Sequence, residues 1–325
     1  MAFVVFAFIG YLNIKLIHIE TWPTDGSNIN GFITNFSAQL IDVLRDKKPS
    51  NYNKEAVSEL EKEYDYAKND LSSKPDIIVI MDESFADLRV LGNDINTSEE
   101  IMPFYDSLSK NAVKGYALSS TFGGGTANSE YEFLTGNTMG FLTDGATVYQ
   151  LYLNDEVYSL ARYLKSEDYY SFATHPYLSS GWSRTKAYPL LGFDSYTFSD
   201  DYPKEKLIRG FVSDQEMFEY ITGWYENWRS KNSGPLFLFG VSMQNHGDYD
   251  YEGEGYILSI SLNGYSKDYK DVEQYLGLIH ETDKAFEYLI RFFEKIDHEV
   301  VICFFWRSLA KIRSRLLSGI TWIRI

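Results

Sequence analysis

Two short polar segments hold the residues best suited to chemistry. The first, Asp82 and Glu83, directly follows the run 77–81, whose β-branched residues are typical of a buried parallel strand. Open α/β sheets bind ligands beyond the carboxyl ends of their strands, so these carboxylates are candidate metal ligands. The simpler alternative is that they cap the helix that follows.

The second segment is a glycine turn, 123–125, followed by a predicted helix over 126–134. Glycines allow the tight turn, and the start of a helix offers free N–H groups and the positive end of its dipole to an anion. A hydroxyl at this place, that of Thr126, can attack or hold a phosphoryl group. The simpler interpretation is that Thr126 caps the helix, with Ser129 and Glu130 in the first turn.

In this order, the two segments resemble the lipoteichoic acid synthase and phosphoglycerol transferase branch of the sulfatase-like (alkaline phosphatase-like) superfamily, over residues 74–305. The resemblance implies an α/β fold with a central, mostly parallel sheet flanked by helices. It also implies that Glu83 and Thr126 bind a divalent metal, usually manganese in that family. Thr126 is then the catalytic nucleophile.

Further segments fit the same family in the expected order. The resemblance places His175, Trp182 and Arg184 in the pocket for the glycerophosphate group, and His246 at the mouth of the site. Arg offers a planar fork to phosphate, and His can exchange a proton near neutral pH. Taken singly, Trp182 could be a core aromatic, Arg184 a surface charge and His246 a cap or loop residue.

Alternating strands and helices must position these residues, and such alternation predicts a doubly wound α/β domain. Besides 77–81, the predicted strands are 171–174, 236–241 and 300–305, and the predicted helices are 157–165, 214–228 and 272–294.

The segments before the α/β domain have a different character. Residues 1–22 open with 14 residues that carry no charge, fewer than the roughly 20 apolar residues that span a bilayer. No positive charge precedes this run and no small residues follow it, as they would in a signal peptide. We expect the remnant of a transmembrane helix, with a signal peptide and a buried helix as alternatives, followed by a helical linker over 23–73.

The family pattern breaks after residue 305. The family takes its last two metal ligands from a Gly-Asp-His segment after the final strand, whereas this chain continues with Trp306, Arg307 and Ser308. The tail 306–325 holds five basic residues and no acidic one. A shift of the reading frame explains both changes, because codons compatible with Trp-Arg-Ser can read Gly-Asp-His one nucleotide later. We therefore expect metal binding by this chain to be impaired, and the chain itself to be inactive.

The net charge of −16 offers no basic surface for nucleic acid, so we expect no nucleic-acid partner. The resemblance implies transfer of glycerophosphate from phosphatidylglycerol to a cell-surface polymer or glycolipid, by a domain on the outer side of the cell membrane. One alternative is a hydrolase of the sulfatase or phosphodiesterase type, although sulfatases use Cys or Ser where this chain has Thr126. The other alternative is a non-catalytic remnant.

Overall fold

The computed structural model describes residues 73–306, except 92–94, 116–123, 143–145, 254–258, 266 and 268, together with 52–63 and a few positions between 28 and 50. The predicted membrane remnant 1–22 and residues 307–325 of the predicted tail lie outside the described residues. Helix α4 (Lys54–Glu63) falls within the predicted linker. No helix among the described residues is long and apolar enough to cross a bilayer. The chain divides into two compact units, and the sheet and the candidate site belong to the second, residues 74–137 with 148–325.

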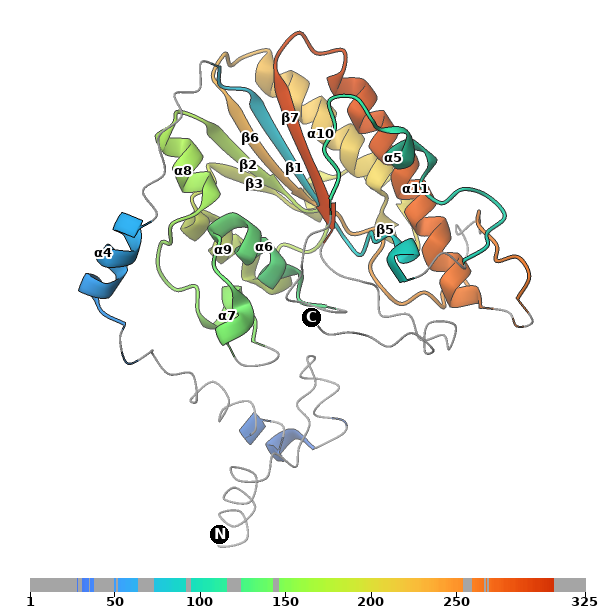
Figure 1. Cartoon of the computed structure of the whole chain (residues 1–325), viewed down its shortest axis with the longest axis horizontal. Coiled ribbons are helices and arrows are strands. Elements are labelled where there is room, and N and C mark those ends of the chain that lie inside the picture. Colours follow the sequence, from blue (N-terminus) through green and yellow to red (C-terminus); the bar gives the residue numbers. More distant parts are fainter. Residues whose placement is uncertain are drawn as a thin grey trace, which may run out of the picture. The chain divides into compact units, whose positions relative to one another are not determined.

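A parallel sheet of five strands, in the order β3-β2-β6-β1-β7, forms the centre of this unit (Figure 1). Its strands are β1 (Asp76–Asp82), β2 (Tyr170–Thr174), β3 (Ser195–Thr197), β6 (Leu236–Val241) and β7 (Val300–Trp306). Strands covered on both faces need apolar side chains on both, which explains the nearly continuous apolar runs of β1 and β6. Four of the five strands were predicted, whereas β3 is too short to show a pattern.

Helices cover both faces of the sheet (Figure 1). On one face, α10 (Asp214–Arg229) and α11 (Lys270–Phe293) share a buried apolar cluster with residues of β1, β2 and β6. On the other face lie α6 (Thr126–Thr135), α8 (Leu160–Ser166) and α9 (Arg184–Leu191). There the ring of Phe133 stacks on Phe239 and Phe305, with centroids 6.0 and 4.6 Å apart. The predicted α/β fold, a mostly parallel sheet flanked by helices, is confirmed.

The last strand includes Trp306, the residue at which the aberrant tail was predicted to begin. Trp306 is in register with Asp82 across the pair of strands. Its ring lies 5.7 Å from that of Phe85. The carboxyl ends of β1 and β7 are therefore level, and Trp306 lies directly opposite Asp82.

Several short elements join the main ones. They are too short to show a helical or strand period in the sequence. In the second unit they are η1 (Leu88–Leu91), α5 (Pro103–Ser107), α7 (Val148–Leu151), η3 (Gly181–Ser183), η4 (Ser199–Asp201) and the antiparallel pair of β4 (Leu207–Ile208) and β5 (Phe211–Val212).

Candidate active site

The structure brings Glu83 and Thr126 into contact at the carboxyl edge of the sheet. The Thr126 hydroxyl donates to Oε2 of Glu83 at 3.3 Å, and both side chains are buried. Ser84, in the left-handed region with φ of 54°, donates its own hydroxyl to Oε1 of Glu83 at 3.3 Å. A carboxylate and a threonine hydroxyl 43 residues apart in the chain thus form one polar pair.

Thr126 is not the cap of its helix, so that alternative is wrong. The N-cap of α6 is Gly125, which adopts φ of 79°, and no side chain caps this end. Thr126 is the first helical residue, and its hydroxyl points across to the end of β1 instead. The hydroxyl therefore lies at the N-terminal end of α6, where the helix dipole stabilises negative charge.

Asp82 and Glu83 do not cap a following helix either, because a network across the sheet holds this strand end. Ser242 donates to Asp82 at 3.0 Å and accepts from the backbone N–H of Glu83 at 2.9 Å. Asn245 donates to the other carboxylate oxygen of Asp82 at 3.0 Å. The loop after β6 therefore fixes the backbone from which the Glu83 side chain projects.

A second buried carboxylate, Asp214 at the start of α10, lies close to Asp82. Burial, together with the negative charge of Asp214, raises the pKa of Asp82 well above its usual value. Burial likewise raises the pKa of Asp214 to about 7, although hydrogen bonds such as the one from Thr282 oppose the shift. Two acids this deeply buried cannot both be ionised at low cost, so the pair retains a proton in the folded protein.

Arg184 is buried and paired with Glu130, so the surface-charge alternative is wrong. Its Nε donates to both carboxylate oxygens of Glu130, at 3.0 and 3.2 Å, and Nη2 bonds the same group. The two side chains are 1% and 0% exposed. Tyr188 and Tyr149 donate to Oε2 of Glu130 at 3.2 and 3.5 Å. Both oxygens of the Glu130 carboxylate therefore accept hydrogen bonds from buried donors of the same domain.

The turn before Arg184 has an unusual backbone. Trp182 and Ser183 both lie in the left-handed region, with φ of 53° and 57°. Such conformations cost roughly 1–3 kcal/mol for residues other than glycine and persist where the surroundings enforce them. The Trp182 side chain is half-buried, which contradicts the alternative that Trp182 is a core aromatic. The Gly181 carbonyl accepts from Nη1 of Arg184 at 3.4 Å and ties the turn to the ion pair.

His175 follows β2 and is 2% exposed. Its Nδ1 donates to the carbonyl of Val241 at 2.9 Å, which leaves Nε2 as the acceptor atom. Burial holds the pKa of His175 well below its usual value, and the positive charge of Arg184 and the proximity of His246 lower it further. His175 is therefore a neutral hydrogen-bond acceptor at neutral pH, rather than a proton donor.

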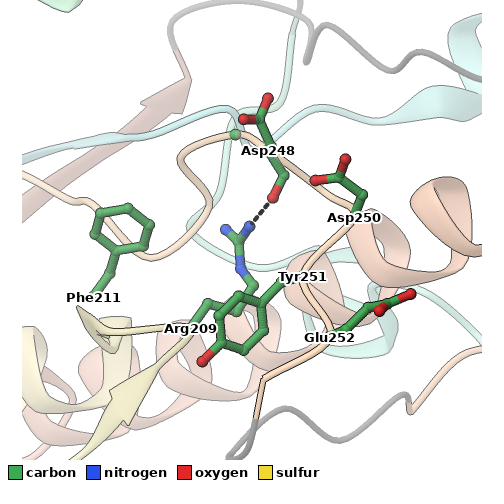
Figure 2. A pocket seen from close by; sticks show the side chains of 7 residues that line it. Arg209, Phe211, Asp248, Asp250, Tyr251 and Glu252 are labelled. Atoms are coloured by element: carbon green, nitrogen blue, oxygen red, sulfur yellow. Dashed lines mark hydrogen bonds between the residues drawn. The ribbon is translucent and has the colours of Figure 1, made fainter.

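His246 lies in the loop after β6, half-buried, with Nδ1 donating to the Gly247 carbonyl at 2.8 Å. Its ring is 5.6 Å from Phe211, and ring contacts from Phe211 to Tyr177 and from Tyr177 to His175 connect the two histidines. Beside this loop is a cavity of about 360 Å³ (Figure 2). Its lining consists of Arg209, Phe211, Gly247, Asp248, Asp250, Tyr251 and Glu252.

A divalent metal finds two suitable oxygen donors here, the Glu83 carboxylate and the Thr126 hydroxyl. In the part of the chain that the structure describes, no group of three or more His, Cys, Asp or Glu side chains could hold a metal ion. The described residues thus provide one side of a metal site, and further ligands would have to come from elsewhere.

Sequence reasoning missed Glu130 as a partner in the site. It was noted only as a residue of the first turn of the helix, yet it lies four positions after Thr126 and so on the same helix face. That spacing indicates that Glu130 lies near Thr126, but nothing in the sequence indicates which cation pairs with it. Asp214 and Arg209 gave no such signal.

A match to the Sulfatase family covers residues 75–305. The chain therefore belongs to the sulfatase family, within the alkaline phosphatase-like superfamily. The predicted membership of the sulfatase-like superfamily is confirmed.

Two solved structures with the same fold carry more specific names. One is the Streptococcus pyogenes phosphoglycerol transferase GacH in complex with sn-glycerol-1-phosphate, with a TM-score of 0.66, 19% identity, and 83% of this chain and 72% of that chain covered. The other is the lipoteichoic acid synthase LtaP from Listeria monocytogenes, with a TM-score of 0.64, 21% identity, and 76% of this chain and 60% of that chain covered.

Two relatives from Rhizobium meliloti are similar in sequence. A putative cyclic beta-1,2-glucan modification protein is 30% identical over 295 residues, which cover 90% of this chain and 44% of the relative. The capsular polysaccharide biosynthesis protein RkpI is 30% identical over 236 residues, 71% of this chain and 40% of the relative. The chain spans less than half the length of either relative.

Proposed function

We propose that this chain carries the catalytic domain of a phosphoglycerol transferase, which moves glycerophosphate from phosphatidylglycerol to a hydroxyl of a cell-surface polymer or glycolipid. The observation that carries the proposal is the 3.3 Å contact of the Thr126 hydroxyl with Glu83, at the start of a helix beyond the edge of a parallel sheet. The glycerophosphate ligand of the S. pyogenes neighbour supports glycerophosphate as the transferred group. The glucan in the name of the first relative supports a sugar polymer as the acceptor.

The reaction has two displacements at phosphorus. First, the Thr126 oxygen forms a bond to the donor phosphorus, the bond from phosphorus to the diacylglycerol oxygen breaks, and diacylglycerol leaves with a proton. The acceptor hydroxyl then attacks the same phosphorus, its proton is released, and Thr126 regains a proton as its bond to phosphorus breaks. Glu83 accepts the hydrogen bond of the Thr126 hydroxyl and orients it before the first step.

Glu83 and Thr126 would also hold one side of a divalent metal, for which manganese is our proposal. When bound, the ion would lower the pKa of the threonine hydroxyl and neutralise phosphate charge. Because Thr126 is the first residue of α6, the positive end of the helix dipole would stabilise developing negative charge beside it as well.

The remaining predicted residues have distinct proposed roles around the glycerophosphate. Neutral His175 accepts a hydrogen bond from a glycerol hydroxyl through Nε2. Trp182 packs beside the glycerol, and His246 binds phosphate at the mouth of the site. Glu130 engages the Nε–Nη2 edge of Arg184, so a phosphate contact of Arg184 would use its Nη1–Nη2 edge.

The residues that line the cavity beside His246 are suited to binding a neutral acceptor rich in hydroxyl groups. Aromatic rings of Phe211 and Tyr251 suit the faces of sugars, and carboxylates such as Asp250 and Glu252 accept hydrogen bonds from hydroxyls but repel free phosphate. We further propose that the domain lies on the outer surface of the cell membrane, where the proposed lipid donor and the polymer or glycolipid acceptor would meet.

The test uses phosphatidylglycerol labelled in its headgroup, a glucan acceptor and manganese, with the chain compared to a version read in the alternative frame from residue 306 on. We expect the frame-restored version to release diacylglycerol and label the glucan, and Thr126→Ala to abolish both. Ser129→Ala, which removes a neighbouring hydroxyl of the same helix, is the matched control and should retain transfer. Label found in free glycerophosphate instead of glucan would support a hydrolase. Unchanged turnover in Thr126→Ala would reassign the nucleophile.

A further inference from the structure

The turn between β4 and β5 places an arginine where the backbone favours smaller residues. Its two central residues, Arg209 and Gly210, have φ of 52° and 81°. Positive φ at both central residues is the pattern of a type I′ hairpin turn, for which Asn, Asp and Gly are the usual residues. An Arg is strained here, so contacts of its side chain must compensate for the conformation.

Those contacts lie in the loop that carries His246. The Arg209 guanidinium donates to the carbonyls of His246 and Asp248, both at 2.6 Å, and to that of Gln244 at 2.9 Å. The residue is 7% exposed. Three carbonyls at alternate positions of one loop thus converge on a single buried cation, and charge-assisted bonds of this kind are stronger than neutral ones.

Aromatic rings hold the cation and the loop together. The guanidinium carbon lies 5.8 Å from the ring centre of Phe211 and 5.5 Å from that of Tyr249. Tyr249 donates its hydroxyl to the Asn245 carbonyl at 2.8 Å, and Phe211 contacts the His246 ring. Figure 2 shows the Arg209 side chain reaching the Asp248 carbonyl from the hairpin, inside the ring of residues that line the cavity.

We propose that Arg209 is a positioning residue, which fixes the peptide planes of the loop 244–248 and thereby sets the orientation of the His246 ring. The positioning role itself does not depend on the proposed function. Its effect on catalysis does rest on that function, in which His246 binds the substrate phosphate. The guanidinium suits the task because it is planar and always charged and offers five donors in fixed directions. A lysine ammonium has three donors around one point and can reach fewer of the three carbonyls at once.

The experiment compares His246 in the whole chain before and after Arg209→Met. Ring signals of ¹⁵N-labelled histidine are assigned with a His246→Gln variant, and amide exchange of 244–248 is followed by mass spectrometry. Arg162→Met is the matched control, because Arg162 also donates to a backbone carbonyl, that of Leu190 at 3.1 Å in the last turn of α9, away from His246. His280, whose ring bonds the Ile101 carbonyl at 3.1 Å, is the internal reference.

We expect Arg209→Met to shift or broaden the His246 ring signals and to accelerate amide exchange of the loop by about tenfold or more, because several charge-assisted bonds are lost. His280 should not change, Arg162→Met should leave His246 as it is, and Arg209→Lys should restore part of the wild-type signal. Unchanged His246 signals in folded Arg209→Met, or an equal change in Arg162→Met, would overturn the inference.

A second variant and a separate measurement of turnover complete the experiment. If Arg209→Met does not fold, Arg209→Gln, which keeps one amide donor group, is used with the same expectation and the same overturning result. Turnover is measured separately in the frame-restored version. An absence of transfer with wild-type Arg209 counts against the proposed function alone, whereas the His246 signals test the positioning role without any turnover.

Discussion

The Arg184 guanidinium and the Glu130 carboxylate form an ion pair inside the domain, 54 residues apart in the chain. Glu130 is on α6, which begins with Thr126, and Arg184 follows the left-handed turn that contains Trp182. The pair therefore joins the segment that carries the proposed nucleophile to the segment proposed to bind glycerophosphate. Loss of either charge should disturb both segments.

Glu130→Gln should destabilise the folded domain. The change leaves the buried Arg184 charge without its counter-charge, and breaking a buried pair in this way costs about 3–5 kcal/mol. Chemical denaturation measures the free energy of unfolding. The exposed substitution Glu205→Gln is the control and should stay within about 0.5 kcal/mol of wild type.

The double variant Glu130→Gln with Arg184→Met should recover part of this loss, because it removes the unpaired charge as well. A Glu130→Gln protein as stable as wild type would show that the pair contributes little to folding.

His175 should remain neutral at a pH where an unperturbed imidazole is half protonated. Its pKa is held well below its usual value by burial and by the charge of Arg184, so its ring signals should not titrate as the pH is lowered from 8 through 6.5. Nuclear magnetic resonance of the ring nitrogens should show a proton on Nδ1 and none on Nε2 throughout this range, as the bond to Val241 requires. A midpoint near the usual 6.5 would contradict this environment.

Asp214 should make the domain less stable as the pH rises. Its pKa is raised from 3.8 to about 7 by burial, so between these values the folded state binds a proton that the unfolded state has lost. The contribution of this carboxyl to the free energy of unfolding is therefore complete below pH 3.8. It is lost as the pH rises from 3.8 through about 7.

The Asp214→Asn variant tests this effect, since the amide is neutral at every pH; it also removes the charge that helps to raise the pKa of Asp82. The free energy of unfolding of wild type minus that of the variant should fall as the pH increases from 4 to 8. A flat difference would show that Asp214 ionises normally in the folded protein.

Manganese should not remain bound to this chain during gel filtration, because one carboxylate and one hydroxyl are too few ligands to hold the ion against water. The frame-restored version, with a Gly-Asp-His segment after Phe305, should retain about one equivalent. Adding Glu83→Gln to that version should release the metal again. Equal metal content and equal diacylglycerol release in the two chains would contradict both the frame shift and the metal assignment.

The sequence by itself determined the main elements of the sheet and the place of the proposed nucleophile. The runs inside β1 and β6 are continuously apolar, because strands buried on both faces leave no room for alternation. The run of β7 is apolar as well, although this strand is only partly buried. The glycine turn before Thr126 likewise acts locally, since the left-handed Gly125 starts the helix at the next residue. Such signals come from neighbouring residues and can be read without knowing the fold.

The tertiary structure alone decided which charges meet. Nothing near Arg184 in the sequence shows that its guanidinium is paired with Glu130, or that Arg209 reaches the carbonyls around His246. Tertiary packing determines these partners. A buried charge is stable only when a counter-charge or a carbonyl lies within hydrogen-bonding distance, and the packing of the chain determines which group that is. The distance along the chain carries no information about that choice.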